Sequence, residues 1–346
     1  MSVRENFFST LEVLRESFLT EAKAKKNKSS QDTKGKLHEI LVGYHIQGGR
    51  HMERFKDKEG DSPKQAHDKL KESVTPEEYK KINHRAKSAA SDLKKKIEST
   101  GHKVSHVHWT SKAGDIKRST GIESSQKEDA SDIMVHTTKG KKSKYHGVSL
   151  KVSDGKSKHV PVSNPGMEST HGGHKIVNAH REEILKKFPS LKKATNAKQR
   201  KDIMKASPRM DAWVRKKNNE TLHKLGDHLH KTLSKMQPHE LAHHIQTHVL
   251  QSNPTPLQKA GHDHIRHTTY ATKDGHAHHS YNPHEHFQHI FKDPKNITHN
   301  VKVEHTGGAS VQFKYKGKTF ASHRLKFNSQ SDPLSSVKGS GTTHGD

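Results

Sequence analysis

The sequence predicts an α/β fold in which a mixed sheet is flanked by helices and carries a helical insertion at about residues 190–260. Apolar residues at helical spacing dominate the chain from 36 to 99 and again from 174 to 250. Short alternating or continuous apolar runs, typical of strands, occupy residues 103–152 and return at 300–327. We therefore expect the later strands to complete the sheet that the earlier strands begin.

Composition limits the class of protein further. The 346 residues include 63 Lys and Arg against 37 Asp and Glu, which gives a formal charge of +26, and 34 His; 27% are hydrophobic. A chain this basic is expected to bind a polyanion, of which nucleic acid is the commonest. Cys is absent, which excludes disulfides and Cys-ligated metal sites. No run of about 18 apolar residues could span a membrane, and the N-terminus lacks the apolar core of a secretory signal.

The chain divides by composition into four parts. Residues 1–24 have apolar side chains at helical spacing and predict an amphipathic helix. Residues 25–35 are polar and basic, which indicates a linker. The predicted domain covers residues 36–330, and residues 331–346 are expected to form a flexible tail.

The expected helices have recognisable faces and ends. In residues 36–56, four apolar side chains share one helical face: Leu37, Ile40, Leu41 and Tyr44. A helix is expected from Pro76 to Ser99, because Thr75 and Pro76 are typical of a helix start and Gly101 of an end. Later helices are expected at about 174–188, 196–206, 208–230 and 238–250.

Strand patterns follow the first helices. The expected strands are Lys103–Trp109, Asp132–Thr137, Tyr145–Val152, Asn300–His305, Ala309–Tyr315 and Thr319–Phe327, with a weaker one at His267–Thr272. Gly140 begins a turn that would join the second and third strands as a hairpin. The rest of 252–282 is interpreted as a His-rich loop.

This hairpin carries the residue types that phosphodiester cleavage needs. Asp132 opens one strand, and Ser149 and Lys151 share one side of the next because strand residues alternate. The hairpin would bring Asp132 close to Lys151, and Glu39 lies beside the apolar face of the helix 36–56. Magnesium prefers carboxylate oxygens, and a nearby lysine can stabilise developing charge or position water. The pattern predicts a metal site with an adjacent lysine.

A helix Glu, a strand Asp and a strand Ser-x-Lys resemble the PD-(D/E)XK nuclease superfamily, in the segments KLHEILVGYHI, EDASDIMVHT and YHGVSLKVS. The resemblance covers roughly residues 36–190. It implies a restriction-endonuclease-like fold and a phage-encoded endonuclease, a hydrolase that cuts DNA with Mg²⁺, or with Mn²⁺ as a substitute. The implied active-site residues are Glu39, Asp132, Lys151 and Ser149, of which Glu39 and Asp132 bind metal. Ser149 stands where the superfamily usually has an acidic residue, so a third carboxylate is sought among Asp129, Asp154 and Glu168.

Three lysines around the hairpin turn are candidates for DNA contacts: Lys141, Lys142 and Lys144. Many lysines and few aromatic residues favour contacts with phosphates over contacts with bases. The expected partner is double-stranded DNA, and no membrane partner is expected. The alternative function is that of a non-enzymatic basic protein that binds or condenses DNA inside a phage head.

Histidine patterns offer a weaker alternative. Residues 239–243 read His-Glu-Leu-Ala-His, the spacing of a zinc-protease helix. With 34 His in the chain this match arises readily by chance, and Pro238 puts it in the first turn of a helix, so a solvated helix face is the favoured interpretation. Other His clusters would gain charge near pH 6 and strengthen polyanion binding. They are 262/264/267, 276/278/279 and 284/286/289.

The N-terminal segment has a resemblance of its own. Phe18-Leu19-Thr20-Glu21-Ala22 resembles the Leu-x-Glu cleavage signal that ends the capsid-targeting segment of phage internal head proteins. A plain amphipathic docking helix is the favoured interpretation of this segment. Together with the nuclease resemblance, this implies a protein of the host cytoplasm or one carried in the virion.

Overall fold

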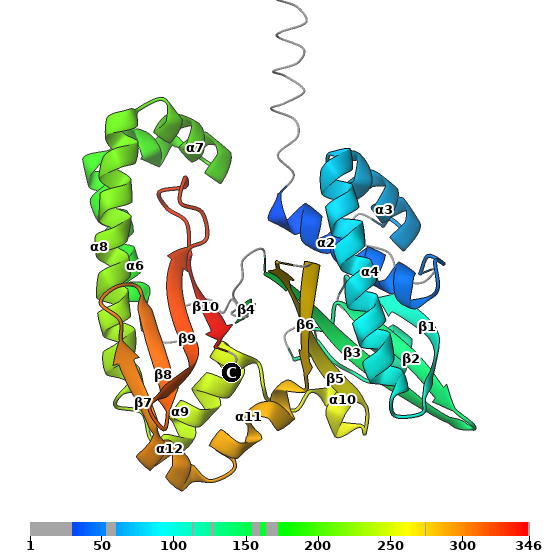
Figure 1. Ribbon diagram of the computed structural model, residues 1–346. Coiled ribbons are helices and arrows are strands. Elements are labelled where there is room, and N and C mark those ends of the chain that lie inside the picture. The colour runs from blue at the N-terminus through cyan, green and yellow to red at the C-terminus, as the bar shows by residue number, and fades with distance from the viewer. Residues whose placement is uncertain are drawn as a thin grey trace, which may run out of the picture. The chain divides into compact units, whose positions relative to one another are not determined.

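The computed structural model describes residues 30–52, 60–112, 114–125, 128–153, 160–163, 172–273 and 275–344. The fold is mixed α/β, as the sequence predicts, and the chain divides into two compact units (Figure 1). Unit 1 comprises Met1–Gly155 and Pro254–Tyr281, and unit 2 comprises Lys156–Asn253 and Asn282–Asp346. Each unit has its own sheet, which differs from the one domain expected over 36–330.

The described part of unit 1 has the helices α2 (Gln31–Ile46), α3 (Pro63–Glu72), α4 (Pro76–Glu98), the short α5 (Asp115–Thr120) and, after the insertion of unit 2 residues, α10 (Pro256–Lys259). A side chain caps the N-terminus of each of them except α5. Ser30 accepts a hydrogen bond from Thr33 N, so α2 starts inside the segment expected to be a linker. Thr75 and Glu78 form a capping box on α4, which confirms the predicted start of that helix. The amphipathic segment 1–24 lies outside the described residues.

The sheet of unit 1 has the strand order β1-β2-β3-β5-β6. Its strands are β1 (Lys103–Trp109), β2 (Ile133–Lys139), β3 (Lys142–Ser153), β5 (Asp263–Thr272) and β6 (Gly275–Tyr281). β3 and β5 are parallel, and the other neighbours are antiparallel. Gly140, with φ 60°, makes the predicted turn between β2 and β3. β6 occupies part of the segment interpreted as a loop, so that interpretation is wrong there.

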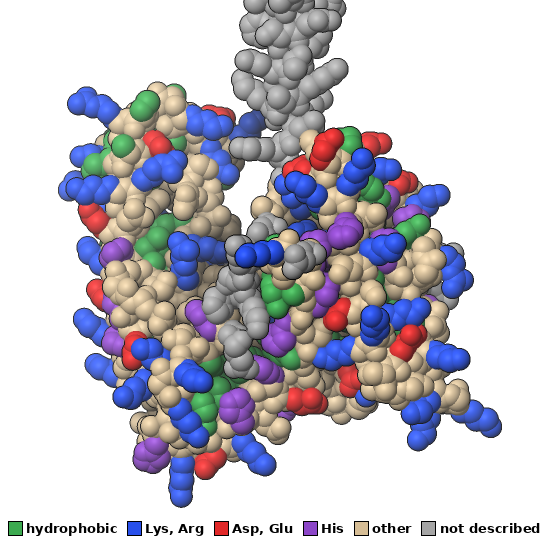
Figure 2. All heavy atoms as spheres, viewed as in Figure 1, with side chains coloured by type: hydrophobic (Ala, Val, Ile, Leu, Met, Phe, Trp, Pro, Cys, Tyr) green, Lys and Arg blue, Asp and Glu red, His purple; other side chains and the backbone are tan. Residues whose placement is uncertain are grey.

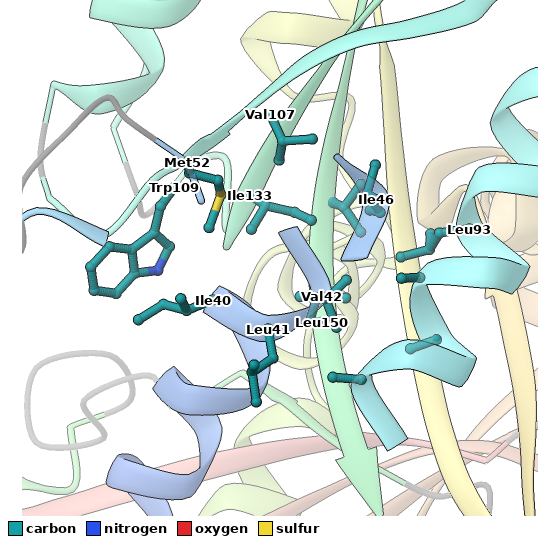
Figure 3. Packing of buried hydrophobic residues seen from close by; sticks show 14 of the residues in the cluster. Ile40, Leu41, Val42, Ile46, Met52, Leu93, Val107, Trp109, Ile133 and Leu150 are labelled. Carbon is teal, nitrogen blue, oxygen red and sulfur yellow. The ribbon is translucent and has the colours of Figure 1, made fainter. Parts of the chain in front are cut away.

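The core of unit 1 lies between helices α2 and α4 and one face of the sheet (Figure 3). The labelled side chains include Ile40, Leu41 and Val42 of α2, Leu93 of α4, Val107 of β1, Ile133 of β2 and Leu150 of β3. All of them are buried. Because this packing fixes the rotation of α2 against the sheet, it also fixes where the polar residues beside the apolar face of α2 point.

Unit 2 places helices around an antiparallel sheet. The helices are α6 (His174–Lys187), the 3₁₀ turn η1 (Pro189–Lys193), α7 (Ala197–Lys205), α8 (Pro208–Leu233), α9 (Pro238–His244), the π-helical η2 (Ile245–Leu250), α11 (Pro283–Phe291) and α12 (Pro294–Asn300). The strands are β4 (Val160–Ser163), β7 (Val301–His305), β8 (Ser310–Tyr315), β9 (Lys318–Phe327) and β10 (Val337–Thr343), in the order β4-β10-β9-β8-β7.

Two expectations about the C-terminal part are wrong. The later strands pair with one another and with β4, and do not complete the sheet that holds Asp132. The expected flexible tail 331–346 contains β10, which pairs with β9 along its whole length. Its buried Val337 supplies the apolar contact that keeps it on the sheet. In the described residues, no helix is long and apolar enough to cross a membrane.

Candidate active site

Glu39 sits on α2, next to the core residue Ile40. The indole Nε1 of Trp109, at the end of β1, donates a hydrogen bond to Glu39 Oε2 at 3.3 Å. Burial raises the pKa of Glu39 from 4.5 to about 8, and the negative charge of Asp132 acts in the same direction. The Trp109 hydrogen bond and the positive charge of Lys151 oppose this shift. Glu39 therefore lies within electrostatic reach of both predicted partners.

Asp132 immediately precedes β2, and its backbone and side chain both bond to β3. Its backbone N donates to Val148 O at 2.8 Å. Its carboxylate Oδ2 accepts a hydrogen bond from Leu150 N at 2.6 Å, so the side chain extends the hydrogen bonding between the two strands beyond the first residue of β2. As the hairpin predicts, Lys151 Nζ lies 3.7 Å from Asp132 Oδ2. The carboxylate is thus held in place by the backbone of the strand that carries the lysine.

Ser149 precedes Lys151 by two residues on β3. It is buried on β3 opposite Arg266 of the parallel strand β5. Among the described residues, its side chain makes no hydrogen bond to Glu39, Asp132 or Lys151. Its role in the site therefore stays a prediction that rests on the superfamily resemblance.

Among the described residues, no third carboxylate joins Glu39 and Asp132 in a metal-binding cluster. Asp129 is buried, where it accepts from Ser131 N at 3.1 Å and lies 3.4 Å from His264 Nδ1. Burial alone would raise the pKa of Asp129, but the bonds from His264 and Ser131 outweigh it and lower the pKa. Asp154 and Glu168 lie outside the described residues. The described residues contain no cluster of three or more His, Asp or Glu arranged for a metal ion.

A pocket of about 490 Å³ opens beside Glu39 and Lys151 within unit 1. Basic side chains from α2 and α4 line it: Lys34, Lys81 and Arg85. Lys34 Nζ is paired with Glu78 at 2.6 Å. Sequence reasoning missed this basic lining and Trp109. Lys81 and Arg85 are four residues apart on α4, so a shared helix face could have been predicted, but not that it borders Glu39.

The candidate DNA-binding lysines lie at the other end of the hairpin. Lys141 is in the turn, and Lys142 pairs with Lys139 at the start of the ladder. Lys144 Nζ makes an ion pair with Asp263 at 2.8 Å. Lys151 lies seven positions after Lys144 on the same strand, a span of roughly 23 Å. Any phosphate that they contact is therefore distant from the pocket.

The His-Glu-Leu-Ala-His motif lies on α9 of unit 2. Gln237 N donates to Glu240 Oε2 at 3.0 Å, so Glu240 caps the helix. Neither histidine belongs to a metal cluster among the described residues. This role of Glu240 agrees with the structural interpretation of the motif.

No protein-family model matches the chain, and no curated protein matches it. The function has to be inferred from the residues of the site.

Proposed function

We propose that the protein is a Mg²⁺-dependent endonuclease of the PD-(D/E)XK type that hydrolyses DNA phosphodiester bonds. The observation that carries the proposal is the 3.7 Å approach of Lys151 Nζ to Asp132 Oδ2, together with Glu39, which lines one pocket with Lys151. A helix Glu, a strand Asp and a lysine on the next strand are the parts that the superfamily resemblance implies. The charge of +26 supports a polyanionic substrate independently of the site.

The side chains present fit magnesium. Burial raises the pKa of Glu39, and the nearby charge of Asp132 raises it further, so a cation held by both carboxylates would relieve this repulsion. Magnesium is commonly bound by one or two carboxylates, with waters and substrate phosphate oxygens completing its shell. Glu39 and Asp132 would hold it. When bound, it would neutralise charge on the phosphate and activate water.

Residues around the two carboxylates have separate tasks in this proposal. The Leu150 N–H and the Trp109 indole orient the carboxylates of Asp132 and Glu39. The Lys151 ammonium group stabilises the charge that develops on the phosphate oxygens during the attack of water. Lys81 and Arg85, on the pocket wall, hold the neighbouring phosphates of the DNA.

The test is incubation with supercoiled plasmid, with Mg²⁺ and with EDTA. We expect nicked or linear products with Mg²⁺ and none with EDTA. Lys151→Ala should lower the rate about 100-fold or more while DNA affinity stays nearly unchanged, because one lysine among 63 basic residues adds little to binding. Lys87→Ala, an exposed lysine of α4 outside the pocket, is the matched control and should cleave like the parent.

The same assay separates the alternative function. Salt-sensitive DNA binding with no Mg²⁺-dependent cleavage would overturn the enzyme assignment. It would support a non-enzymatic protein that binds or condenses DNA, for which the high positive charge is sufficient. Full activity of Lys151→Ala would show that the chemistry lies elsewhere.

A further inference from the structure

A polar groove of about 680 Å³ lies within unit 2, between helix α8 and the end of strand β9. α8 runs beside the sheet that contains β7, β8 and β9 (Figure 1). The helix contributes five residues spaced i, i+3, i+4, i+7 and i+8, which form one face: Arg215, Asn218, Asn219, Leu222 and His223. The opposite side is formed by residues 324–327 of β9 and by the 306–310 turn between β7 and β8.

The walls of this groove are held at a fixed separation. Gly226 of α8 lies so close to the turn that an added Cβ would collide with the carbonyl oxygen of Gly308. His305 Nε2 bonds to the same oxygen at 2.8 Å, and its Nδ1 lies 3.2 Å from Asp227 Oδ1 on α8. This close contact holds the 306–310 turn against α8, where it closes one end of the groove.

The groove presents side-chain hydrogen-bond donors. Asn218 Oδ1 lies 2.9 Å from His180 Nε2, and Thr221 Oγ1 lies 2.9 Å from His180 Nδ1. Burial lowers the pKa of His180, so the ring is neutral, donates to Asn218 and accepts from Thr221. The amide NH₂ of Asn218 is then available to a ligand in the groove, next to the side-chain amide of Asn219.

Cationic groups line the groove from both sides, and the lining contains no Asp or Glu. Arg215 approaches from α8 and is paired with Asp211 at 2.7 Å. Arg324 and Lys326 are exposed and lie two residues apart on β9, so they share one face of the strand. Within the described residues neither makes an ion pair. Figure 2 shows how Lys and Arg side chains outnumber acidic ones on the visible face.

The strand geometry opens the groove to an extended ligand. The last pair between β8 and β9 joins Ser310 to Arg324, and Leu325 N still donates to Ala309 O at 2.7 Å. Lys326 and Phe327 of β9 lie beyond this last bond and line the groove past the end of β8. An open groove with guanidinium, ammonium and amide donors suits a chain of phosphates better than a compact apolar ligand.

We propose that this groove binds the phosphodiester backbone of nucleic acid and gives unit 2 a DNA contact of its own. The proposal goes beyond the nuclease activity proposed for unit 1 and does not rest on it. Its occupant is a phosphodiester strand, because the groove offers donors for phosphate oxygens and no carboxylate to accept from base amino groups.

The test measures binding with cleavage prevented. The full chain with Asp132→Asn, in EDTA, is titrated onto a fluorescent random-sequence duplex from about 50 to about 200 mM salt. Into this chain we place R324A/K326A. The matched control is K302A/K318A, which removes two exposed lysines from the same sheet outside the groove.

Each lost phosphate contact reduces the slope of log affinity against log salt concentration by about 0.9. R324A/K326A should therefore reduce this slope by about 1.8 and weaken DNA binding about ten-fold or more. K302A/K318A should change the slope and the affinity much less. Asn219→Asp places a carboxylate of the same size in the groove and should also weaken binding. Trp213 fluorescence during thermal unfolding checks that unit 2 stays folded in each variant. Equal effects of the two double variants, or unchanged binding by Asn219→Asp, would overturn the proposal.

Discussion

Unit 1 should lose stability as the pH falls below about 6.5, and His267 on β5 is a main reason. Its side chain is fully buried. Its Nδ1 lies 2.6 Å from Ser280 Oγ on β6, and its Nε2 lies 3.2 Å from Thr269 Oγ1. Burial lowers the pKa of His267 to about 3, and the positive charges of three neighbours act in the same direction: His278, Lys96 and His279. Asp92 Oδ2, 3.6 Å from Nδ1, faces the ring from α4 and opposes them.

The sign follows from linkage. The pKa of His267 is lower in the folded chain than in the unfolded one, so the unfolded chain takes up a proton first. The stability that the neutral His267 contributes to the folded state is fully present above about pH 6.5 and is lost as the pH falls toward about 3. At about pH 5 the unfolded imidazole has gained roughly 1.5 pH units of protonation free energy, or roughly 2 kcal/mol. His267→Gln keeps a polar side chain and removes this titration.

The assay uses the two tryptophans of the chain, Trp109 in unit 1 and Trp213 in unit 2. In a Trp213→Phe background, fluorescence during urea unfolding reports on unit 1 alone. Between about pH 7.5 and 5, His267→Gln should lose about 2 kcal/mol less unfolding free energy than its parent. His84→Gln, on the exposed side of α4, is the control and should follow the parent. An equal pH dependence in His267→Gln and the parent would refute the reasoning.

Three more substitutions test the site and the fold. Asp132→Asn should weaken binding of Mg²⁺ or Mn²⁺ in calorimetry, because a hard cation prefers an anionic oxygen. Unchanged metal affinity would show that Asp132 is not a metal ligand. Trp109→Phe removes the donor to Glu39 and should slow cleavage about ten-fold, with duplex affinity by anisotropy nearly constant; an equal loss of both would argue against a positioning role. Gly226→Ala should destabilise unit 2 by about 1–3 kcal/mol, because its Cβ would strike the turn at Gly308; unchanged Trp213 unfolding would show that the turn moves aside.

Local patterns were sufficient to predict the hairpin. The apolar runs around Ile133 and Val148, with a turn at Gly140, predicted both strands to within about three residues at each end, and hence the approach of Asp132 to Lys151. They were not sufficient to predict which sheet a later strand joins. β7, β8 and β9 pair with their sequence neighbours and would look the same in either sheet. The sequence of β6, GHAHHSY, has no apolar side, and every one of its residues is partly exposed in the structure. No hydrophobic pattern therefore indicated a strand there.

Site residues could be predicted when the pattern of their own helix or strand pointed to them. Residues that reach the site only through packing between elements could not be predicted. Glu39 and Asp132 could be chosen from their own helix and strand. Arg85 and Trp109 reach the site only because α4 and β1 pack against α2, and no spacing in the sequence encodes that contact. Ser149 lies opposite Arg266 of β5, a strand from a distant part of the chain, so its surroundings could not be predicted from its own strand either.

That distance has a consequence for synthesis. About 117 residues separate Ser149 on β3 from its parallel partner Arg266 on β5. At roughly 5–20 residues per second, β3 waits about 6–23 s on the ribosome with one edge unpaired. An unpaired strand edge invites pairing with other chains. Glu39, Asp132 and Lys151 are all translated before β5 emerges, but the sheet that supports them is completed only when it does. The candidate active site is therefore among the last parts of unit 1 to become rigid.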